Sequence, residues 1–292
     1  MKKWIFRLFL ALLVVIVGLL VTIQIMTPPI LLSNGIPEID RERDAKVLSS
    51  FFGRDNDLPL QAILLSRKAP GNDGMPIVFS LEVDPTSLDR TDFQITTSSG
   101  KQLTPSDITL NPANEEFELR TVLMVGEFGD HPQDPPLVLE VVGDVVSRSG
   151  QNYKGQSVQV TPLPDGPFIS YAEYFVIDED YPYVAEGRGC DCPKEETTQV
   201  VRLVWSGGVR ATSGAELGER DLDAHKVSLI QGTVTIQVKP FKLADLKDND
   251  NNIDLCLKES GTPFKVSVEA GTAIDPRDDV NEYTEAVILS RW

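Results

Sequence analysis

The sequence predicts an all-β protein built from two β-sandwiches in tandem, which follow a single apolar transmembrane helix at the N-terminus. Three observations predict this architecture. A long apolar run follows a basic cluster at the N-terminus, short β-rich runs separated by turn residues fill the remainder, and the order of those runs repeats once. With 292 residues, the chain is long enough for about two domains that each bury a core of their own.

The transmembrane anchor is predicted over residues 1–26. Lys2, Lys3 and Arg7 precede the apolar stretch of residues 8–26. A helix rises about 1.5 Å per residue, so this stretch nearly spans a hydrocarbon core of about 30 Å. The basic flank is expected to stay in the cytoplasm, which places the C-terminal region outside it, in a periplasm or the extracellular space. A cleaved signal peptide is the alternative, but its apolar region usually ends at small residues, whereas bulky side chains end this one.

The charge of the chain restricts its partners. The formal net charge is −17, and the three basic residues of the anchor leave 24 basic and 44 acidic residues in the exported part. Such a surface repels nucleic acid and anionic lipid headgroups. We therefore expect no nucleic-acid partner, and contact with the membrane through the N-terminal helix.

The first sandwich is predicted over residues 58–162, after a stalk or linker of residues 27–57 that contains a short helix over residues 39–52. Turn-forming residues separate its strand candidates. These candidates are QAILLS (61–66), MPIVFSLEV (75–83), DFQITTS (92–98), RTVLMVGEF (120–128), LVLEVVG (137–143) and QSVQVTP (156–162). Several strands at this spacing over about 100 residues are typical of a β-sandwich.

The second sandwich, residues 168–292, repeats this order at low identity. Its strand candidates, in the same sequence as those of the first, are FISYAEYFVID (168–178), QVVRLVWSGGV (199–209), AHKVSLIQG (224–232), NNIDLCL (251–257), FKVSVEAG (264–271) and TEAVILS (284–290). Trp205 lies within one of them and is expected in the core.

A family resemblance follows from PIVFSLEVDPTSLDRTDFQITTSSGK, which starts at Pro76. This stretch resembles the opening of a bacterial Ig-like domain of the S-layer and surface-protein type: a strand, a Val-Asp-Pro turn and a second strand that ends in glycine. VVGDVVSRSGQNYKG (141–155) is similar to the closing loop of that family, whereas EAGTAIDPRDDVNEY (269–283) lacks the matching glycine. The resemblance implies a spacer, adhesive or binding module of the cell envelope, usually without catalysis.

The segment LADLKDNDNNIDLCLKES (243–260) has the acidic alternation of a calcium loop. An EF-hand requires glycine at the sixth position of its loop, where this chain has Ile253, and it requires flanking helices. The alternation of apolar residues after the acidic stretch instead predicts a polar turn that leads into a half-buried strand. A calcium site of another type is the alternative, and its candidate ligands are Asp245, Asp248, Asp250 and Asn252.

The three cysteines, Cys190, Cys192 and Cys256, all lie in the second repeat. In an exported chain a disulfide is expected. A bridge from Cys192 or Cys190 to Cys256 would connect a long loop to a strand and leave one free thiol. A bridge between Cys190 and Cys192 would close a very tight ring, and a metal site of three thiolates would need a fourth ligand such as His225.

The aromatic group YAEYFVIDEDYPYVAEG (171–187) is the other candidate site. Tyr174, Tyr181 and Tyr183 are candidate ligand-binding residues, because aromatic rings with polar tips suit glycan and peptide surfaces. The alternative is that the aromatic residues of the strand pack inward while the Tyr-Pro-Tyr segment stiffens a loop.

No catalytic motif is present: the sequence contains no nucleophile elbow, phosphate loop or zinc-protease helix. We therefore expect a protein that is not an enzyme and requires no cofactor. The expected function is structural, adhesive or binding, in an Ig-like protein anchored in the membrane of a bacterial cell envelope. An envelope protein or a glycan is the expected partner. The alternatives are a calcium-stiffened module that binds glycan or peptide, and a carboxylate-dependent hydrolase.

Overall fold

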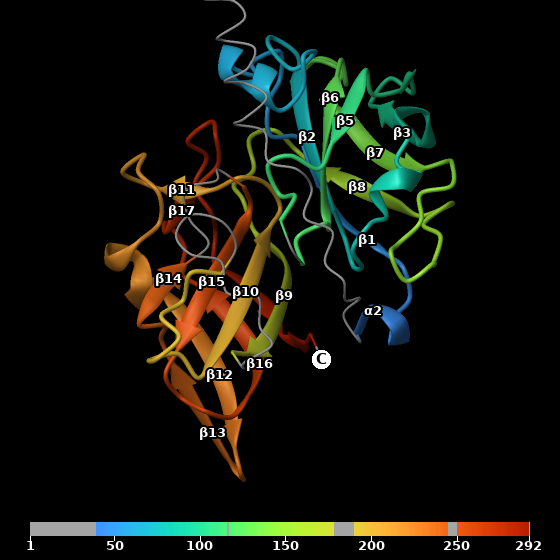
Figure 1. The fold of residues 1–292 in the computed structure, drawn as a ribbon. Coiled ribbons are helices and arrows are strands. Elements are labelled where there is room, and N and C mark those ends of the chain that lie inside the picture. Colours follow the sequence, from blue (N-terminus) through green and yellow to red (C-terminus); the bar gives the residue numbers. More distant parts are fainter. Residues whose placement is uncertain (1–38, 116, 178–189, 245–249, 292) are drawn as a thin grey trace, which may run out of the picture. The chain divides into compact units, whose positions relative to one another are not determined.

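The computed structural model describes residues 39–115, 117–177, 190–244 and 250–291 (Figure 1). Leu32–Trp292 form one compact unit, apart from Met1–Leu31. The predicted anchor at residues 1–26 lies outside the described residues. Among the helices that the structure does describe, none is long and apolar enough to cross a membrane.

The described chain is mostly β-structure, and its first half, here the first copy, contains eight strands. They are β1 (Val47–Phe51), β2 (Asp73–Phe79), β3 (Phe93–Thr97), β4 (Gln102–Leu103), β5 (Asp107–Thr109), β6 (Thr121–Gly126), β7 (Pro136–Val141) and β8 (Ser157–Thr161). The strands form one sheet in the order β4-β3-β7-β8-β1-β2-β6-β5. In this sheet β8 pairs antiparallel with β7 and parallel with β1, so it joins two halves of the sheet.

The second half, here the second copy, starts at β9 and has the same strand order. Its strands are β9 (Ile169–Val176), β10 (Gln199–Trp205), β11 (Arg210–Ala211), β12 (His225–Gln231), β13 (Val234–Val238), β14 (Lys242–Ala244), β15 (Asn252–Leu257), β16 (Thr262–Val268), β17 (Ala273–Ile274), β18 (Thr284–Val287) and β19 (Leu289–Ser290). One sheet runs β13-β12-β16-β18 and another runs β14-β15-β10-β9-β19. The position of β8 is here shared by two strands: β18 pairs antiparallel with β16, and β19 pairs parallel with β9.

Each copy has a hydrophobic core between two layers of strands. In the first copy, Ile77 and Met124 from β2 and β6 meet Phe93 and Leu139 from β3 and β7. In the second copy, the corresponding strands β10, β15, β12 and β16 enclose a core that includes Trp205, which has no exposed surface. Two layers that enclose alternate side chains are the packing expected of a β-sandwich, and the prediction of a core position for Trp205 is confirmed.

The start of the first copy differs from the prediction. QAILLS, predicted as the first strand, forms the 3-10 helix η1 (Leu60–Leu64). The first strand is β1, which the sequence analysis assigned to a helix in the stalk, and the helix that the structure has there, α2 (Ile39–Glu42), is only four residues long. Pairing with β2 and β8 satisfies the backbone of β1 and buries Phe51 and Phe52, which a stalk helix would leave in water.

Short 3-10 turns show how closely the copies correspond. In the first copy, η2 (Pro85–Ser87) and η3 (Arg90–Asp92) precede β3, and the side chain of Asp89 accepts a hydrogen bond from the backbone of Thr91 at the start of η3. In the second copy, η4 (Glu219–Ala224) precedes β12, and the Asp221 side chain accepts from the backbone of Gly218 at 2.8 Å. The acidic residues before both strands therefore cap turns.

The closing loops of the two copies form the same turn. Ser147 N donates to Gln151 O at 2.7 Å, and the equivalent Asp275 N donates to Asp279 O at 3.0 Å. The fourth residue of each turn has a left-handed backbone: Gly150 has φ +88° and Asp278 has φ +74°. The glycine that the second copy lacks is thus replaced by aspartate, one of the few other residues that adopt this conformation readily.

Replacing Gly150 with alanine should destabilise the protein by about 1 kcal/mol. A Cβ at this position meets no atom within 4 Å, so the cost comes from the left-handed backbone alone. Gly150→Asp, which copies the residue of the second copy, should cost less. Urea unfolding of the two variants measures the difference, and an alanine variant as stable as the wild type would contradict the assignment of backbone strain.

Candidate functional site

The outward face of the sheet formed by β9, β10 and β15 is buried, although it faces away from the core of the second copy. Glu173, Arg202 and Asp254 are direct cross-strand partners, so they form one row of alternating charge across the three strands. None of the three is more than 1% exposed. The prediction of an alternating strand at residues 251–257 is confirmed, but its polar face is buried rather than solvated.

Arg202 is held by carboxylates from both copies. Its Nε and Nη2 donate to the two oxygens of Asp254 at 2.8 and 2.9 Å, which is the bidentate geometry that guanidinium groups favour. Its Nη1 lies 2.9 Å from Glu118 Oε1, which precedes β6 in the first copy. One buried arginine therefore joins the two copies.

Arg120, from the first copy, makes a second connection. Its Nη1 donates to Ser80 O at 2.6 Å, and its Nη2 lies 3.1 Å from Asp40 Oδ1 and 3.5 Å from Glu173 Oε2. The guanidinium carbon is also 4.5 Å from the ring centroid of Tyr171, in β9. Three of these contacts place a charge beside an opposite charge or an aromatic face, the partners that a buried arginine requires.

Glu173 binds a third arginine near the end of the chain. Arg291 Nε donates to Glu173 Oε1 at 2.8 Å, and its Nη2 also contacts that oxygen. The Arg291 guanidinium lies 3.7 Å from the ring centroid of Phe175 and 4.6 Å from that of Phe117. Burial alone would raise the pKa of the Glu173 carboxyl, but Arg291 and Arg120 outweigh burial and hold this pKa below its ordinary value.

We call these residues the interface charge network, because they connect the copies and are all at most 1% exposed. Its members are Asp40, Glu118, Arg120, Glu173, Arg202, Asp254 and Arg291. Beside it, Arg148 Nη1 pairs with Glu82 Oε2 at 2.8 Å. Burial raises the pKa of Glu82, although Arg120 and Arg148 oppose that shift.

Neutral contacts accompany the network between the copies. Val78 of the first copy packs with Tyr171 and Val204 of the second. Polar side chains add hydrogen bonds across the same contact: Ser49 Oγ to Ser170 Oγ at 2.7 Å, and Asn251 Nδ2 to Thr121 Oγ1 at 3.0 Å. The charges are thus enclosed by packed side chains, which keeps water out and strengthens their attraction.

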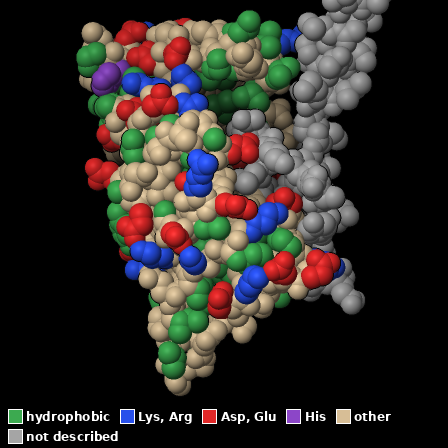
Figure 2. All heavy atoms as spheres, turned by 90° about the vertical axis from the view of Figure 1, so that its left-hand side faces the viewer, with side chains coloured by type: hydrophobic (Ala, Val, Ile, Leu, Met, Phe, Trp, Pro, Cys, Tyr) green, Lys and Arg blue, Asp and Glu red, His purple; other side chains and the backbone are tan. Residues whose placement is uncertain are grey.

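The exposed surface contrasts with this buried network. On the face drawn in Figure 2, acidic and basic side chains are interspersed. The exposed ion pairs of the described residues include Lys258–Glu196 at 2.6 Å and Lys265–Glu285 at 3.1 Å. Such pairs keep a surface soluble and contribute little to stability.

The structure joins Cys192 to Cys256 in a disulfide and leaves Cys190 free and buried. This is one of the two pairings that the sequence left open. The bond connects the segment before β10 to the outward face of β15. Its loop spans 64 residues of the chain.

Two of the candidate calcium ligands, Asp245 and Asp248, lie outside the described residues. The side chain of Asp250 accepts hydrogen bonds from Asn252, from the backbone N at 2.7 Å and from Nδ2 at 2.6 Å, so the two residues form a polar turn before β15. Within the described ranges, no group of three or more histidine, cysteine, aspartate or glutamate side chains is placed to hold a metal ion.

Of the three candidate aromatic ligand-binding residues, too, only some lie within the described residues. Tyr181 and Tyr183 lie outside the described residues. Tyr174 is half-buried against the core of the second copy, and Tyr171 and Phe175 are buried against the arginines of the network. The aromatic residues of β9 therefore serve packing and cation–π contacts.

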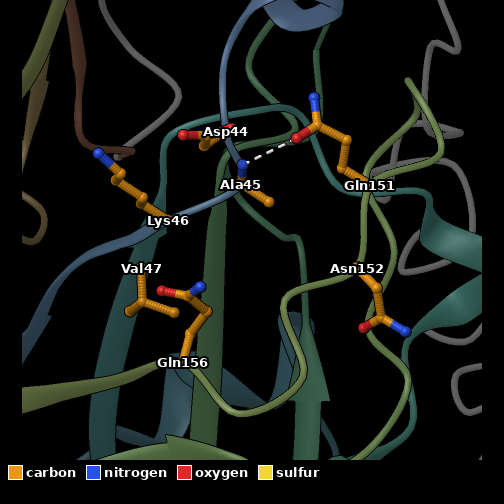
Figure 3. Close-up of a pocket in the computed structure, with 7 residues that line it drawn as sticks. All are labelled: Asp44, Ala45, Lys46, Val47, Gln151, Asn152 and Gln156. Atoms are coloured by element: carbon orange, nitrogen blue, oxygen red, sulfur yellow. Dashed lines mark hydrogen bonds between the residues drawn. The ribbon is translucent and has the colours of Figure 1, made fainter.

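An open depression lies beside the start of β1 (Figure 3). Its lining is mostly polar and consists of Asp44, Ala45, Lys46, Val47, Gln151, Asn152 and Gln156. Gln151 Oε1 accepts from Ala45 N at 3.0 Å, and Gln151 Nε2 donates to the carbonyl oxygens of Arg43 and Asp40. This glutamine fixes the link between α2 and β1 to the closing loop of the first copy.

Sequence reasoning missed the interface charge network, since a single charged residue within a β-strand normally faces water. The available signal was a charged residue in the middle of each of two mainly apolar strands, Arg202 in β10 and Asp254 in β15.

Comparisons with known proteins identify no family. No protein-family model matches the chain, and no curated protein matches it. Among solved structures, the chain is similar to the N-terminal part of the bacterial S-layer protein SbsC, with 9% sequence identity and a TM-score of 0.29. The match covers 85% of this chain and 44% of that one, so the chain spans less than half of the structure it matches. That score is too low to indicate a shared fold.

Proposed function

We propose that this chain is a structural module of the bacterial cell envelope, in which two tandem Ig-like β-sandwiches form one rigid extracytoplasmic body. The N-terminal segment anchors it in the membrane, and it acts without catalysis. An envelope protein or a glycan is its partner. The strand order supports the Ig-like assignment, because in both copies the first strand pairs parallel with the last one.

The observation that carries the proposal is the interface charge network. Domains joined only by a linker usually move relative to each other, unless their contact is large and well packed. Here three arginines, each at most 1% exposed, are held by carboxylates, and Arg120 and Arg202 pair with carboxylates of both copies. Separating the copies would break the Arg202–Glu118 and Arg120–Glu173 pairs and expose their charges to water. A spacer that holds a fixed length requires this rigidity.

The disulfide supports the extracytoplasmic part of the proposal. Disulfides persist in oxidising compartments and are rare in the cytosol. The net charge of −17 supports a surface that stays in solution and does not bind nucleic acid.

Single-molecule FRET between the copies tests the proposed rigidity. Dyes attached by thioether bonds to Glu140→Cys and Gln237→Cys, both exposed positions, report the distance between the copies in the full chain in lipid nanodiscs. Cys190 is buried and is expected to remain unlabelled. A single narrow distribution of transfer efficiency is expected. A broad or multiple distribution would contradict the rigid spacer and favour two independently moving modules.

A further inference from the structure

The disulfide lies next to the interface charge network on the same face of one sheet. Phe175, Val200 and Cys256 form a cross-strand row on β9, β10 and β15, and the charged row of Glu173, Arg202 and Asp254 lies two residues further along each strand. Alternate residues of a strand share a face and are about 7 Å apart. Cys192, bonded to Cys256, therefore holds its segment beside the charged row.

The segment from Cys190 to Cys192 covers the charged end of that row. Cys190 and Cys192 are at most 2% exposed and pack with Phe175, Val200 and Cys256 in one apolar cluster. Burial, and then the negative charge of nearby Asp254, raise the pKa of the Cys190 thiol, which lies beside this carboxylate. Besides the disulfide, a half-exposed ion pair fixes this segment: Lys242 Nζ donates to Asp191 O at 2.8 Å and lies 3.1 Å from Asp191 Oδ2.

The segment from Cys190 to Cys192, here called the cover, affects the contact between the copies through Arg202. Asp254, under the cover, orients the Arg202 guanidinium through two hydrogen bonds, and the same guanidinium reaches Glu118 of the first copy. Attraction between charges falls as water enters, since the effective dielectric constant rises. Removal of the cover would hydrate Asp254 and Arg202 and weaken the pair with Glu118.

We propose that the Cys192–Cys256 disulfide is a redox-sensitive control of the contact between the two copies. The inference rests on the proposed rigid spacer and adds a regulation to it. A dithiol reductant supplies the two electrons: one of its thiolates attacks a disulfide sulfur and releases one cysteine, and its second thiolate displaces the other cysteine. The products are two thiols on Cys192 and Cys256 and an oxidised dithiol.

The second copy does not depend on this bond for its fold. β15 is paired with β10 over six residues and with β14 over three, and the core that contains Trp205 lies on the opposite face of the sheet. Reduction should therefore release the cover and loosen the contact between the copies while the sandwich remains folded.

The test compares oxidised and reduced full-length protein in nanodiscs, with the same FRET pair and with hydrogen exchange. Reduction should broaden the FRET distribution and lower the protection of residues 117–123 and 171–175 about tenfold, while β12 and β16 stay protected. The double variant Cys192→Ser with Cys256→Ser should behave like reduced protein without any reductant. Cys190→Ser, which keeps the disulfide and changes only the free thiol, is the control and should behave like the oxidised wild type.

Three results would overturn the inference. A narrow FRET distribution in protein whose free thiols prove complete reduction would show that the disulfide does not control the contact, and the rigid spacer would stand. Loss of protection in β12 and β16 would show that the bond stabilises the sandwich itself. A FRET distribution that is already broad in the oxidised protein would contradict both the proposed rigid spacer and its proposed control by the disulfide.

Discussion

Replacing Arg202 with methionine should destabilise the protein by about 3–5 kcal/mol, one of the two largest effects expected of a single substitution in this chain. The substitution keeps most of the side-chain volume but leaves Asp254 and Glu118 as buried carboxylates that have lost their arginine. A buried charge whose partner is removed costs much more than the pair contributes, because the desolvation of the remaining charge is no longer offset. Urea unfolding at pH 7 measures the loss.

A triple variant separates the loss of the pair from the penalty on the charges left behind. In Arg202→Met with Asp254→Asn and Glu118→Gln, the arginine and both carboxylates that it binds lose their charges together, so most of the lost stability should return. Lys265→Met removes an exposed partner of Glu285 and is the matched control, for which we expect no resolvable change. An Arg202→Met protein as stable as the control would show that water or other groups reach these carboxylates.

Much of the strand order was predictable from the sequence, because it depends on local patterns. The apolar run at residues 199–205, the apolar alternation at residues 251–257 and the turn residues between strands depend on a few neighbouring positions. Five of the six expected correspondences between repeats join strands in equivalent positions of the sheets. The sixth is wrong, since QAILLS has strand-like residues but forms η1, and only long-range pairing with β2 and β8 shows that β1 is the first strand.

The buried network could not be predicted in the same way. A polar residue that alternates with apolar ones indicates a solvated face, and Asp254 fits that pattern, whereas Arg202 is a single charge within an apolar run. Their burial depends on the first copy, whose residues Glu118 and Arg120, in the segment before β6, are distant in the chain. The pairing of Cys192 with Cys256 was likewise one of two pairings that the sequence left open. The spacing of the cysteines does not reveal that this bond lies on the covered face of β15.

Replacing Glu173 with glutamine should have an effect of the same size, about 3–5 kcal/mol at pH 7. Glu173 binds two arginines, Arg291 and Arg120, and it also accepts from the Tyr171 hydroxyl at 3.1 Å. Glutamine preserves the shape but removes the charge between two buried guanidinium groups. Arg120 keeps Asp40 and the Ser80 carbonyl as partners, whereas Arg291 loses its paired carboxylate, so the end of the chain should loosen first.

The pH dependence distinguishes this charge effect from a loss of packing. The pKa of Glu173 is lower in the folded protein than in the unfolded chain, so its contribution to stability is present above the unfolded pKa of about 4.5 and is lost as the pH falls. The stability difference between wild type and Glu173→Gln should therefore shrink between pH 7 and about pH 3, and the loss should begin only as the pH falls to about 4.5. Glu285→Gln, at an exposed position, should show no resolvable difference at either pH. A difference that stays constant for Glu173→Gln would mean that the glutamine disturbs the packing around Tyr171 and Phe175 and that the charge on Glu173 does not hold the copies together.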